Sequence, residues 1–218
     1  EKAGLKLYLG SYPITPATDV LHELSKHKSL GVVTVQCEDE IAGCASAVGA
    51  SYAGALAVTS TSGPGICLKS EAMNLAVIME LPLVVLDVQR GGPATGLPTK
   101  SEQTDLLQVL FGRNGESPMP VLAATSPTDC FDAAYEASKM ALEHMTPVVL
   151  LTDAFVANGS AACKLPKLAD YPAIQPPFVP AELKGAWTPY QRNEEGVRYC
   201  RLQTFERLGQ HLSRQSHI

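Results

Sequence analysis

Few residues in this sequence have the type and spacing that catalysis requires, and most familiar catalytic patterns are absent. The five histidines stand singly, without a nucleophile or a second metal ligand beside them. Residues 63–65 read Gly-Pro-Gly, but Leu68 occupies the place of the third glycine in a dinucleotide-binding fingerprint. The sequence has neither a Gly-Lys-Ser/Thr phosphate loop nor a Gly-x-Ser-x-Gly nucleophile elbow. It therefore does not predict a hydrolase or a metalloenzyme, and it gives dinucleotide binding little support.

Glu40 is the titratable residue with the most unusual neighbourhood. It lies between a predicted strand and a predicted helix of very small residues, and the stretch that follows, residues 41–68, contains no charged side chain. Acidic residues at the start of a helix are favoured by the helix dipole and are usually solvated, so Glu40 taken alone favours a structural interpretation. A chemical role for this carboxyl needs support from the motifs around it.

The elements that would position these residues alternate regularly along the chain. The predicted strands cover residues 32–36, 55–61, 82–88, 121–124 and 147–152, and the predicted helices cover residues 39–53, 69–80, 101–111 and 126–145. Continuous apolar strands separated by helices predict an α/β fold with an open, mostly parallel sheet and helices on both faces. Ligands bind at the carboxyl ends of the strands in such sheets, and the glycine-rich loops follow strands, so we expect a site at that edge.

The pattern changes after about residue 159. The segment that follows has no clean periodicity and is punctuated by prolines at positions 166, 172, 176, 177, 180 and 189. We therefore predict one domain over residues 1–160 and an irregular, Pro-rich C-terminal arm over residues 161–218, lying on its own domain or on a partner. A flexible tail is the alternative. No role is assigned to the end of the chain from about Tyr199.

Composition argues against several classes of partner. The chain has 218 residues, 45% of them hydrophobic, and a net charge of −5 without a cluster of basic residues, so we do not expect nucleic-acid binding. Its six cysteines form no C-x-x-C pair, which argues against a zinc or iron–sulfur site and favours a reducing cytoplasm. Residues 41–68 are too weakly apolar and too interrupted to form a membrane-spanning helix.

Several motifs, in order, resemble one family. Residues 39–43 (Asp-Glu-Ile-Ala-Gly), 49–54 and 61–65 (Thr-Ser-Gly-Pro-Gly) resemble the pyrimidine-binding domain of thiamine diphosphate enzymes. Residues 12–16 (Tyr-Pro-Ile-Thr-Pro) and 88–99 resemble the α subunit of 2-oxoacid:ferredoxin oxidoreductases, and especially its 2-oxoglutarate branch. The resemblance covers about residues 4–158, and the order of its motifs makes it specific.

The resemblance implies a role for each matching residue. Glu40 would be the catalytic carboxyl that bonds the ring nitrogen of the aminopyrimidine, since a carboxyl in an apolar pocket can keep a proton and share it. Arg90 would grip the 2-oxoacid carboxylate with its two-pronged donor, together with Thr15 and, on a weaker match, Thr99. Without the resemblance, Thr15 would be interpreted as a turn hydroxyl and Arg90 as half of a surface ion pair. The residues implied to contact the cofactor are Pro13, Thr15, Glu40, Ser62 and Gly63.

The sequence also implies a partner. It has no Gly-Asp-Gly followed by a downstream Asn, the motif that holds Mg²⁺ and the diphosphate in thiamine enzymes. The resemblance therefore implies a β subunit that carries the diphosphate-binding domain, the metal and an iron–sulfur cluster. The expected reaction is oxidative decarboxylation of 2-oxoglutarate or a related 2-oxoacid to the acyl-CoA, with electrons passed to ferredoxin. The alternatives are a subunit of a non-oxidative thiamine diphosphate-dependent 2-oxoacid decarboxylase and a non-catalytic nucleotide-binding module on the same scaffold.

Overall fold

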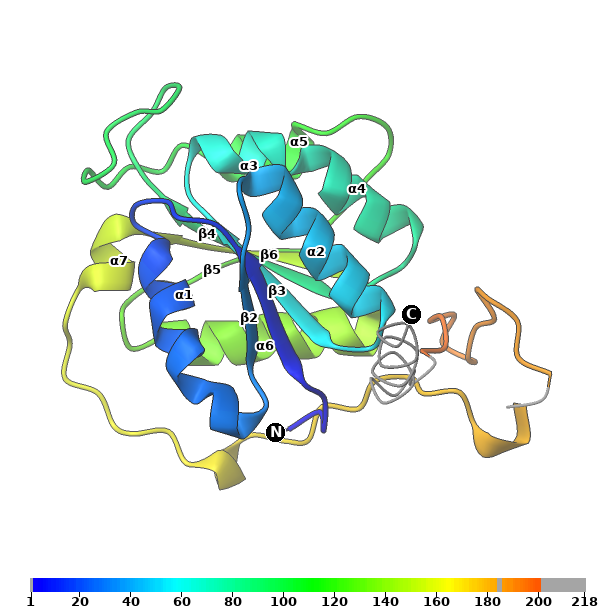
Figure 1. Ribbon diagram of the computed structural model, residues 1–218. Helices are drawn as coiled ribbons and strands as arrows, with labels where there is room; N and C mark the ends of the chain where they lie inside the picture. Colours follow the sequence, from blue (N-terminus) through cyan, green and yellow to red (C-terminus); the bar gives the residue numbers. More distant parts are fainter. Residues whose placement is uncertain (1, 184–185, 201–218) are drawn as a thin grey trace, which may run out of the picture.

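A computed structural model describes residues 2–183 and 186–200 of the chain. It contains one six-stranded sheet with the strand order β2-β1-β3-β4-β6-β5, in which all neighbouring strands are parallel (Figure 1). The strands are β1 (Leu7–Ser11), β2 (Val33–Gln36), β3 (Leu56–Thr61), β4 (Leu83–Gln89), β5 (Val121–Ala123) and β6 (Pro147–Asp153). The predicted α/β class with an open parallel sheet is confirmed.

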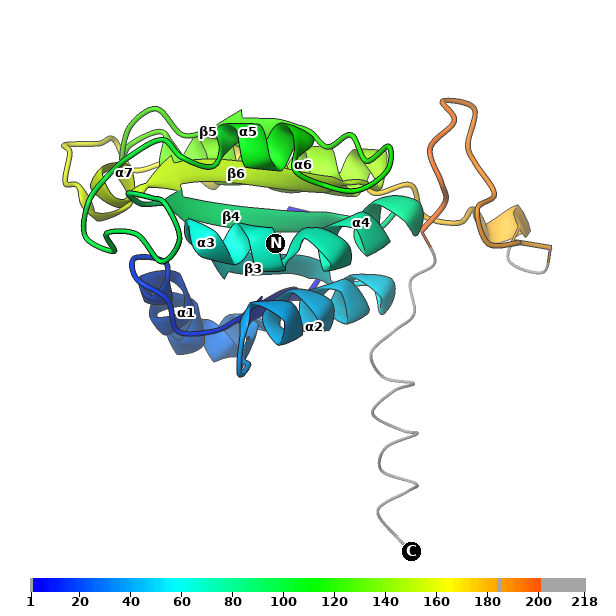
Figure 2. The same ribbon diagram turned by 90° about the horizontal axis from the view of Figure 1, so that it is seen from above.

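Helices cover both faces of this sheet. They are α1 (Thr18–Leu24), α2 (Glu40–Tyr52), α3 (Pro64–Leu68), α4 (Ser70–Ile78), α5 (Leu106–Phe111), α6 (Cys130–His144) and α7 (Ala154–Asn158). Helices α2, α3, α4 and α5 lie on one face, and α1, α6 and α7 lie on the other (Figures 1 and 2). The central strands β4 and β6 are buried from both sides because helices cover each of their faces, which explains their continuous runs of Val and Leu.

Small residues bring α2 unusually close to the sheet. A Cβ atom on Gly10 of β1 would lie 2.3 Å from the Ser46 hydroxyl oxygen and 2.4 Å from the Gly43 carbonyl oxygen of α2, so only glycine fits at this contact. The helix begins where the Asp39 side chain accepts a hydrogen bond from the backbone N–H of Ala42, at 2.8 Å. Its first residue, Glu40, is therefore held at a defined position beside the ends of β1 and β3.

One strand was missed, and the predicted bounds of several helices were wrong. The first strand, β1, was not predicted, and the helix expected over residues 101–111 is only α5. The helix expected over residues 69–80 ends at Ile78, and the separate short helix α3 precedes it. The helix expected from Ser126 begins at Cys130, after a turn in which the Ser126 hydroxyl accepts from the backbone N–H of Asp129 at 3.2 Å.

After α7 the chain continues as an irregular arm that returns along the domain (Figure 1). The ring of Tyr171 packs edge-on against Phe131 and Tyr135 of α6, and the backbone N–H of Ile174 donates to the Lys2 carbonyl, at 3.0 Å. Further on, Arg198 donates to the Met79 and Glu80 carbonyls at the end of α4, and Arg192 forms an ion pair with the Glu80 carboxylate. In the residues that the structure describes, no helix is both long enough and apolar enough to cross a membrane.

Candidate active site

The loops that follow β1, β3 and β4 gather at one end of the sheet, together with the start of α2 (Figures 1 and 2). This is the edge at which parallel sheets bind ligands, because the carboxyl ends of the strands open there into loops. The loops contain most of the predicted site residues: Pro13, Thr15, Ser62, Gly63, Arg90 and Thr99.

The Glu40 side chain lies half-buried against two hydroxyl groups. Tyr12 is 4% exposed, and its hydroxyl is 2.8 Å from the Thr61 hydroxyl. Burial, together with the neighbouring Glu40 carboxylate, raises the pKa of the Tyr12 hydroxyl. A Cβ atom on Gly65 would lie 2.2 Å from both hydroxyl oxygens and 3.1 Å from Cγ of Glu40. The glycine therefore allows these three side chains to converge at the start of α3.

A buried lysine, Lys69, lies beneath the same group and was not predicted to have a role. Its side chain is 0% exposed, and its ammonium donates to the Glu40 carbonyl at 3.1 Å and to the Thr59 hydroxyl at 3.0 Å. The ammonium also lies 5.0 Å from the centroid of the Tyr12 ring. Burial lowers the pKa of the Lys69 ammonium. Lys69 is the first charged residue after the uncharged stretch that begins at Ile41, and that position was the signal in the sequence.

Arg90 is a buried connector between two loops, which rules out the surface ion pair considered as an alternative. Its side chain is 6% exposed, and its two terminal nitrogens donate to the carbonyls of Thr15 (2.6 Å) and Thr95 (2.7 Å). A Cβ atom on Gly63 would lie 3.2 Å from Cγ of Arg90, so the two residues are in close contact. Each terminal nitrogen retains a second N–H, and Nε is buried without a hydrogen-bond partner. Arg90 thus has donors left for a ligand while it fixes the backbone of Thr15.

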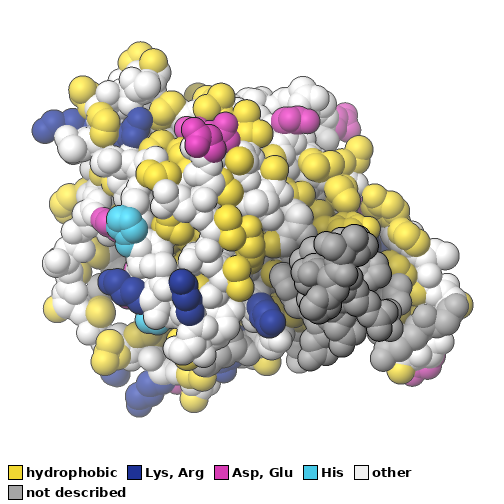
Figure 3. Space-filling view, in the orientation of Figure 1, with side chains coloured by type: hydrophobic (Ala, Val, Ile, Leu, Met, Phe, Trp, Pro, Cys, Tyr) yellow, Lys and Arg dark blue, Asp and Glu magenta, His cyan; other side chains and the backbone are white. Residues whose placement is uncertain are grey.

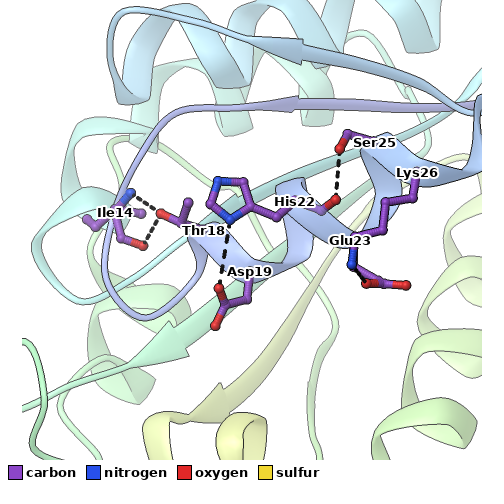
Figure 4. Close-up of polar contacts among 7 residues, drawn as sticks. All are labelled: Ile14, Thr18, Asp19, His22, Glu23, Ser25 and Lys26. Carbon is purple, nitrogen blue, oxygen red and sulfur yellow. Dashed lines mark hydrogen bonds and ion pairs between the residues drawn. The ribbon is translucent and has the colours of Figure 1, made fainter.

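The loop of Thr15 is closed by the first residue of α1 (Figure 4). The Thr18 hydroxyl accepts from the Ile14 backbone N–H at 2.7 Å and donates to the Ile14 carbonyl at 2.9 Å. On the outer side of α1, Asp19 pairs with His22 at 3.9 Å. The two bonds to Ile14 fix the backbone next to Thr15. The side chains of Thr15 and Pro13 are exposed to solvent.

The other predicted residues occupy different environments. The Ser62 hydroxyl is buried without a hydrogen-bond partner, and Gly63 adopts a positive φ of 44°. Thr99 is exposed in the loop after β4, where the Gly91 N–H donates to the Lys100 carbonyl at 2.7 Å. Within the described ranges, Thr99 makes no hydrogen bond to the other predicted residues. The structure thus brings Arg90, Thr15 and Gly63 into contact, whereas Thr99 lies in the loop of Arg90 without a hydrogen bond to these residues among those described.

A buried acid that was not predicted lies near the end of β4. Asp87 is 0% exposed, and burial, reinforced by the Asp105 carboxylate, raises the pKa of the Asp87 carboxyl well above its usual value. Asp105 and the Gly63 N–H both lie near this carboxyl, yet neither of its oxygens has a hydrogen-bond partner of normal geometry. Asp87 is the single charged residue of an apolar strand, and that was its signal in the sequence.

These residues fit the pyrimidine end of thiamine diphosphate. Glu40 forms no ion pair in the part of the chain that the structure describes, so its carboxyl is available to an uncharged ring nitrogen. The Ser62 hydroxyl is a buried polar group that a ligand could satisfy. Residues 2–183 and 186–200 contain no group of three or more His, Cys, Asp or Glu side chains that could hold a metal ion.

Comparison with known proteins gives one consistent family. Residues 2–211 match the model of the pyruvate flavodoxin/ferredoxin oxidoreductase family, thiamine diphosphate-binding domain. The chain is 60% identical over 196 residues to "2-oxoglutarate oxidoreductase subunit KorA" of Mycobacterium tuberculosis, a match that covers 89% of this chain and 30% of that protein. It is 41% identical to "2-oxoglutarate synthase subunit KorA" of Archaeoglobus fulgidus, a match that covers 77% of this chain and 49% of that protein.

A solved structure agrees with these matches. A 2-oxoglutarate:ferredoxin oxidoreductase from Magnetococcus marinus, with 2-oxoglutarate, coenzyme A and succinyl-CoA bound, superposes with a TM-score of 0.85 at 39% identity. The superposition covers 91% of this chain and 34% of that one, so the chain spans less than half the length of each of these three relatives. The chain belongs to the pyruvate flavodoxin/ferredoxin oxidoreductase family and contains its thiamine diphosphate-binding domain.

Proposed function

We propose that this chain acts as the α-subunit half of a 2-oxoacid:ferredoxin oxidoreductase that oxidatively decarboxylates 2-oxoglutarate, or a related 2-oxoacid, to the acyl-CoA. The observation that carries this proposal is the convergence of Glu40, Tyr12 and Thr61 beside the joined loops of Thr15 and Arg90. The relatives named for 2-oxoglutarate support the choice of substrate. They give no support to a non-oxidative decarboxylase or to a nucleotide-binding module.

Thiamine diphosphate would supply the carbon nucleophile and hold the electrons released on decarboxylation. In this chain, Glu40 would hold a proton at its carboxyl and share it with the ring nitrogen of the pyrimidine. The hydroxyls of Tyr12 and Thr61 would orient that carboxyl. Pro13, Ser62 and Gly63 would line the cofactor, with the Ser62 hydroxyl gaining the partner that it lacks here.

For the substrate, the free N–H groups of Arg90 would bind the 2-oxoacid carboxylate, and the Thr15 hydroxyl would bond the same carboxylate or the 2-oxo group. The Arg90–Thr15 contact would make the two act as one unit, because a shift of the guanidinium moves the loop of Thr15. Thr99 would join them from its exposed position in the same loop as Arg90.

A β subunit would complete the site with Mg²⁺, the diphosphate-binding domain and an iron–sulfur cluster that passes electrons to ferredoxin. A face of the chain that is rich in exposed hydrophobic side chains supports docking of this partner. Exposed hydrophobic side chains gather over α2, α3 and α4 (Figure 3), namely Ile41, Tyr52, Leu68, Leu75 and Ile78. The residues near 160 would mark the boundary between the cofactor domain and the arm, and the complex would work in the cytoplasm.

The test of this proposal is Glu40→Gln in the chain co-expressed with its β subunit. The amide cannot share a proton as the carboxyl does, so turnover of 2-oxoglutarate with CoA and ferredoxin should fall by about 100-fold or more. Glu38→Gln is a matched control, because Glu38 is exposed two residues before Glu40. Turnover near that of the unmodified complex for Glu40→Gln would reject the role of Glu40.

A further inference from the structure

Lys69 has an environment that packing alone does not explain. It is the only buried lysine among the residues described, and it forms no ion pair there that would offset the cost of burying its charge. A methionine of similar length would fill the same space without that cost. We therefore expect the Lys69 ammonium to have a function that depends on the groups it contacts.

The contacts of Lys69 reach Glu40 by two routes. The first is through the backbone, where the ammonium donates to the Glu40 carbonyl at 3.1 Å and so holds the first residue of α2. The second is through Tyr12, whose ring lies 5.0 Å from the ammonium and whose hydroxyl neighbours the Glu40 carboxylate. The Thr59 hydroxyl accepts a further bond at 3.0 Å and fixes the ammonium to the sheet.

We propose that Lys69 is a positioning residue for Glu40, tying both its backbone and the hydroxyl group beside its carboxyl to strand β3. This inference rests on the proposed function, because it assigns Lys69 a part in presenting Glu40 to the pyrimidine of thiamine diphosphate. Positioning requires a group that can hold a carbonyl and an aromatic face at once. A lysine ammonium does both, since it has three donors and a charge that aromatic rings attract.

The experiment is a double-mutant cycle of Lys69→Met and Glu40→Gln in the complex with its β subunit, read as the dissociation constant for thiamine diphosphate. If Lys69 acts through Glu40, Lys69→Met should weaken binding by about 10-fold when Glu40 is present and by less than about 2-fold when Glu40→Gln is already in place. Equal weakening in both backgrounds would mean that Lys69 only supports the fold, and it would overturn the inference.

Two further readouts separate positioning from general destabilisation. At saturating cofactor, Lys69→Met should lower kcat by about 10- to 100-fold, with the KM for 2-oxoglutarate within about 3-fold, since a misplaced catalytic group affects the chemical step most. Val148→Ala is the control for lost stability, because Val148 is fully buried on the opposite face of the sheet, against α6. A kcat loss of the same size in Val148→Ala would contradict the inference.

A second variant protects the test if Lys69→Met does not fold. Lys69→Gln keeps a neutral donor at shorter reach, and it should show the same dependence on Glu40 with a smaller effect. The outcome also distinguishes the two proposals. If Glu40→Gln alone leaves cofactor affinity and turnover unchanged, the proposed function fails. If Glu40→Gln is impaired but Lys69→Met has the same effect in both backgrounds, only the role of Lys69 fails.

Discussion

The two faces of the sheet differ in the polarity of the side chain clusters that they bury. On the face covered by α6, the buried cluster of Val84, Ala137, Ala141, Val148 and Leu150 is entirely apolar. On the face covered by α2, α3 and α4, an apolar cluster fills the middle of the domain, but buried polar groups replace it toward the carboxyl ends of the strands. Tyr12, Thr59, Lys69 and Asp87 all lie in that polar region.

This difference shows where the fold gives up stability for a site. Burying an ammonium and an unpaired carboxyl is unfavourable, whereas the apolar cluster against α6 gains free energy from each side chain it buries. The polar side chains keep their positions because the glycines and loops around them hold them through several contacts. Changes in the polar region should therefore affect activity strongly, and changes on the α6 face should affect stability alone.

The largest effect is expected for Gly65→Ala. The new methyl group would overlap the hydroxyls of Tyr12 and Thr61, so Glu40 must move, and activity of the complex should fall by about 100-fold or more. Overpacking should also cost about 1–3 kcal/mol in the free energy of unfolding, measured with urea. The control is Gly49→Ala, at an exposed position of α2 with no heavy atom within 4 Å of the new methyl, which should be neutral or slightly stabilising.

Next in size is Arg90→Lys. A lysine has one nitrogen in place of the two separate terminal nitrogens that bond the Thr15 and Thr95 carbonyls, so the anchor between the loops weakens and the substrate loses a two-pronged donor. The kcat/KM for 2-oxoglutarate should fall by about 10- to 100-fold. The control is Arg113, an arginine of the α5–β5 loop that bonds the Val109 and Ser117 carbonyls. Arg113→Lys should leave the kcat/KM for 2-oxoglutarate unchanged. Equal losses in both variants would remove the special role of Arg90.

On the opposite face, Val148→Ala should reduce stability by about 2 kcal/mol, because two methyl groups are lost from a fully buried site. Turnover per folded complex should stay the same. Urea unfolding and an active-site titration of the thiamine diphosphate bound would check both statements. A clear loss of turnover would show that the two faces are not separable in the way described.

Asp87 should make the stability of the chain depend on pH. Because the folded-state pKa of Asp87 is raised, the folded chain keeps a proton that the unfolded chain releases. The contribution of this proton to the free energy of unfolding is complete below pH 3.8, and it is lost as the pH rises through the folded-state pKa. Stability of the unmodified chain should therefore decline with rising pH by at most about 1.4 kcal/mol per unit in that window. Asp87→Asn should remove the decline and be the more stable protein at its upper end. A constant difference across the window would contradict this account.

Much of the architecture followed from the sequence, because long apolar strands and their alternation with helices are local signals. Strand β1 was missed, since its five residues contain a glycine and acquire their strand conformation from pairing with β2 and β3. The sequence correctly placed Glu40 at the start of a helix and the loop of Arg90 after a strand, whereas the strand before Thr15 was not predicted.

The contacts of the site could not be predicted in the same way. Arg90 bonds a carbonyl 75 residues away in the chain, and Lys69 reaches Glu40 across 29 residues, so both roles depend on the finished fold. A charged residue in an apolar segment signals a buried group, as Lys69 and Asp87 both do, but it does not say which neighbour that group faces. That Gly65 must lack a side chain also emerges only when Tyr12 and Thr61 meet in space.

The central claim is that this chain presents Glu40 to the pyrimidine while another subunit holds the diphosphate. An experimental structure of the complex with its β subunit and thiamine diphosphate tests it most directly. We expect a carboxylate oxygen of Glu40 within about 2.7 Å of the pyrimidine ring nitrogen, with all diphosphate and Mg²⁺ contacts made by the partner. A Glu40 side chain turned to solvent, or a diphosphate bound by residues of this chain, would contradict the account.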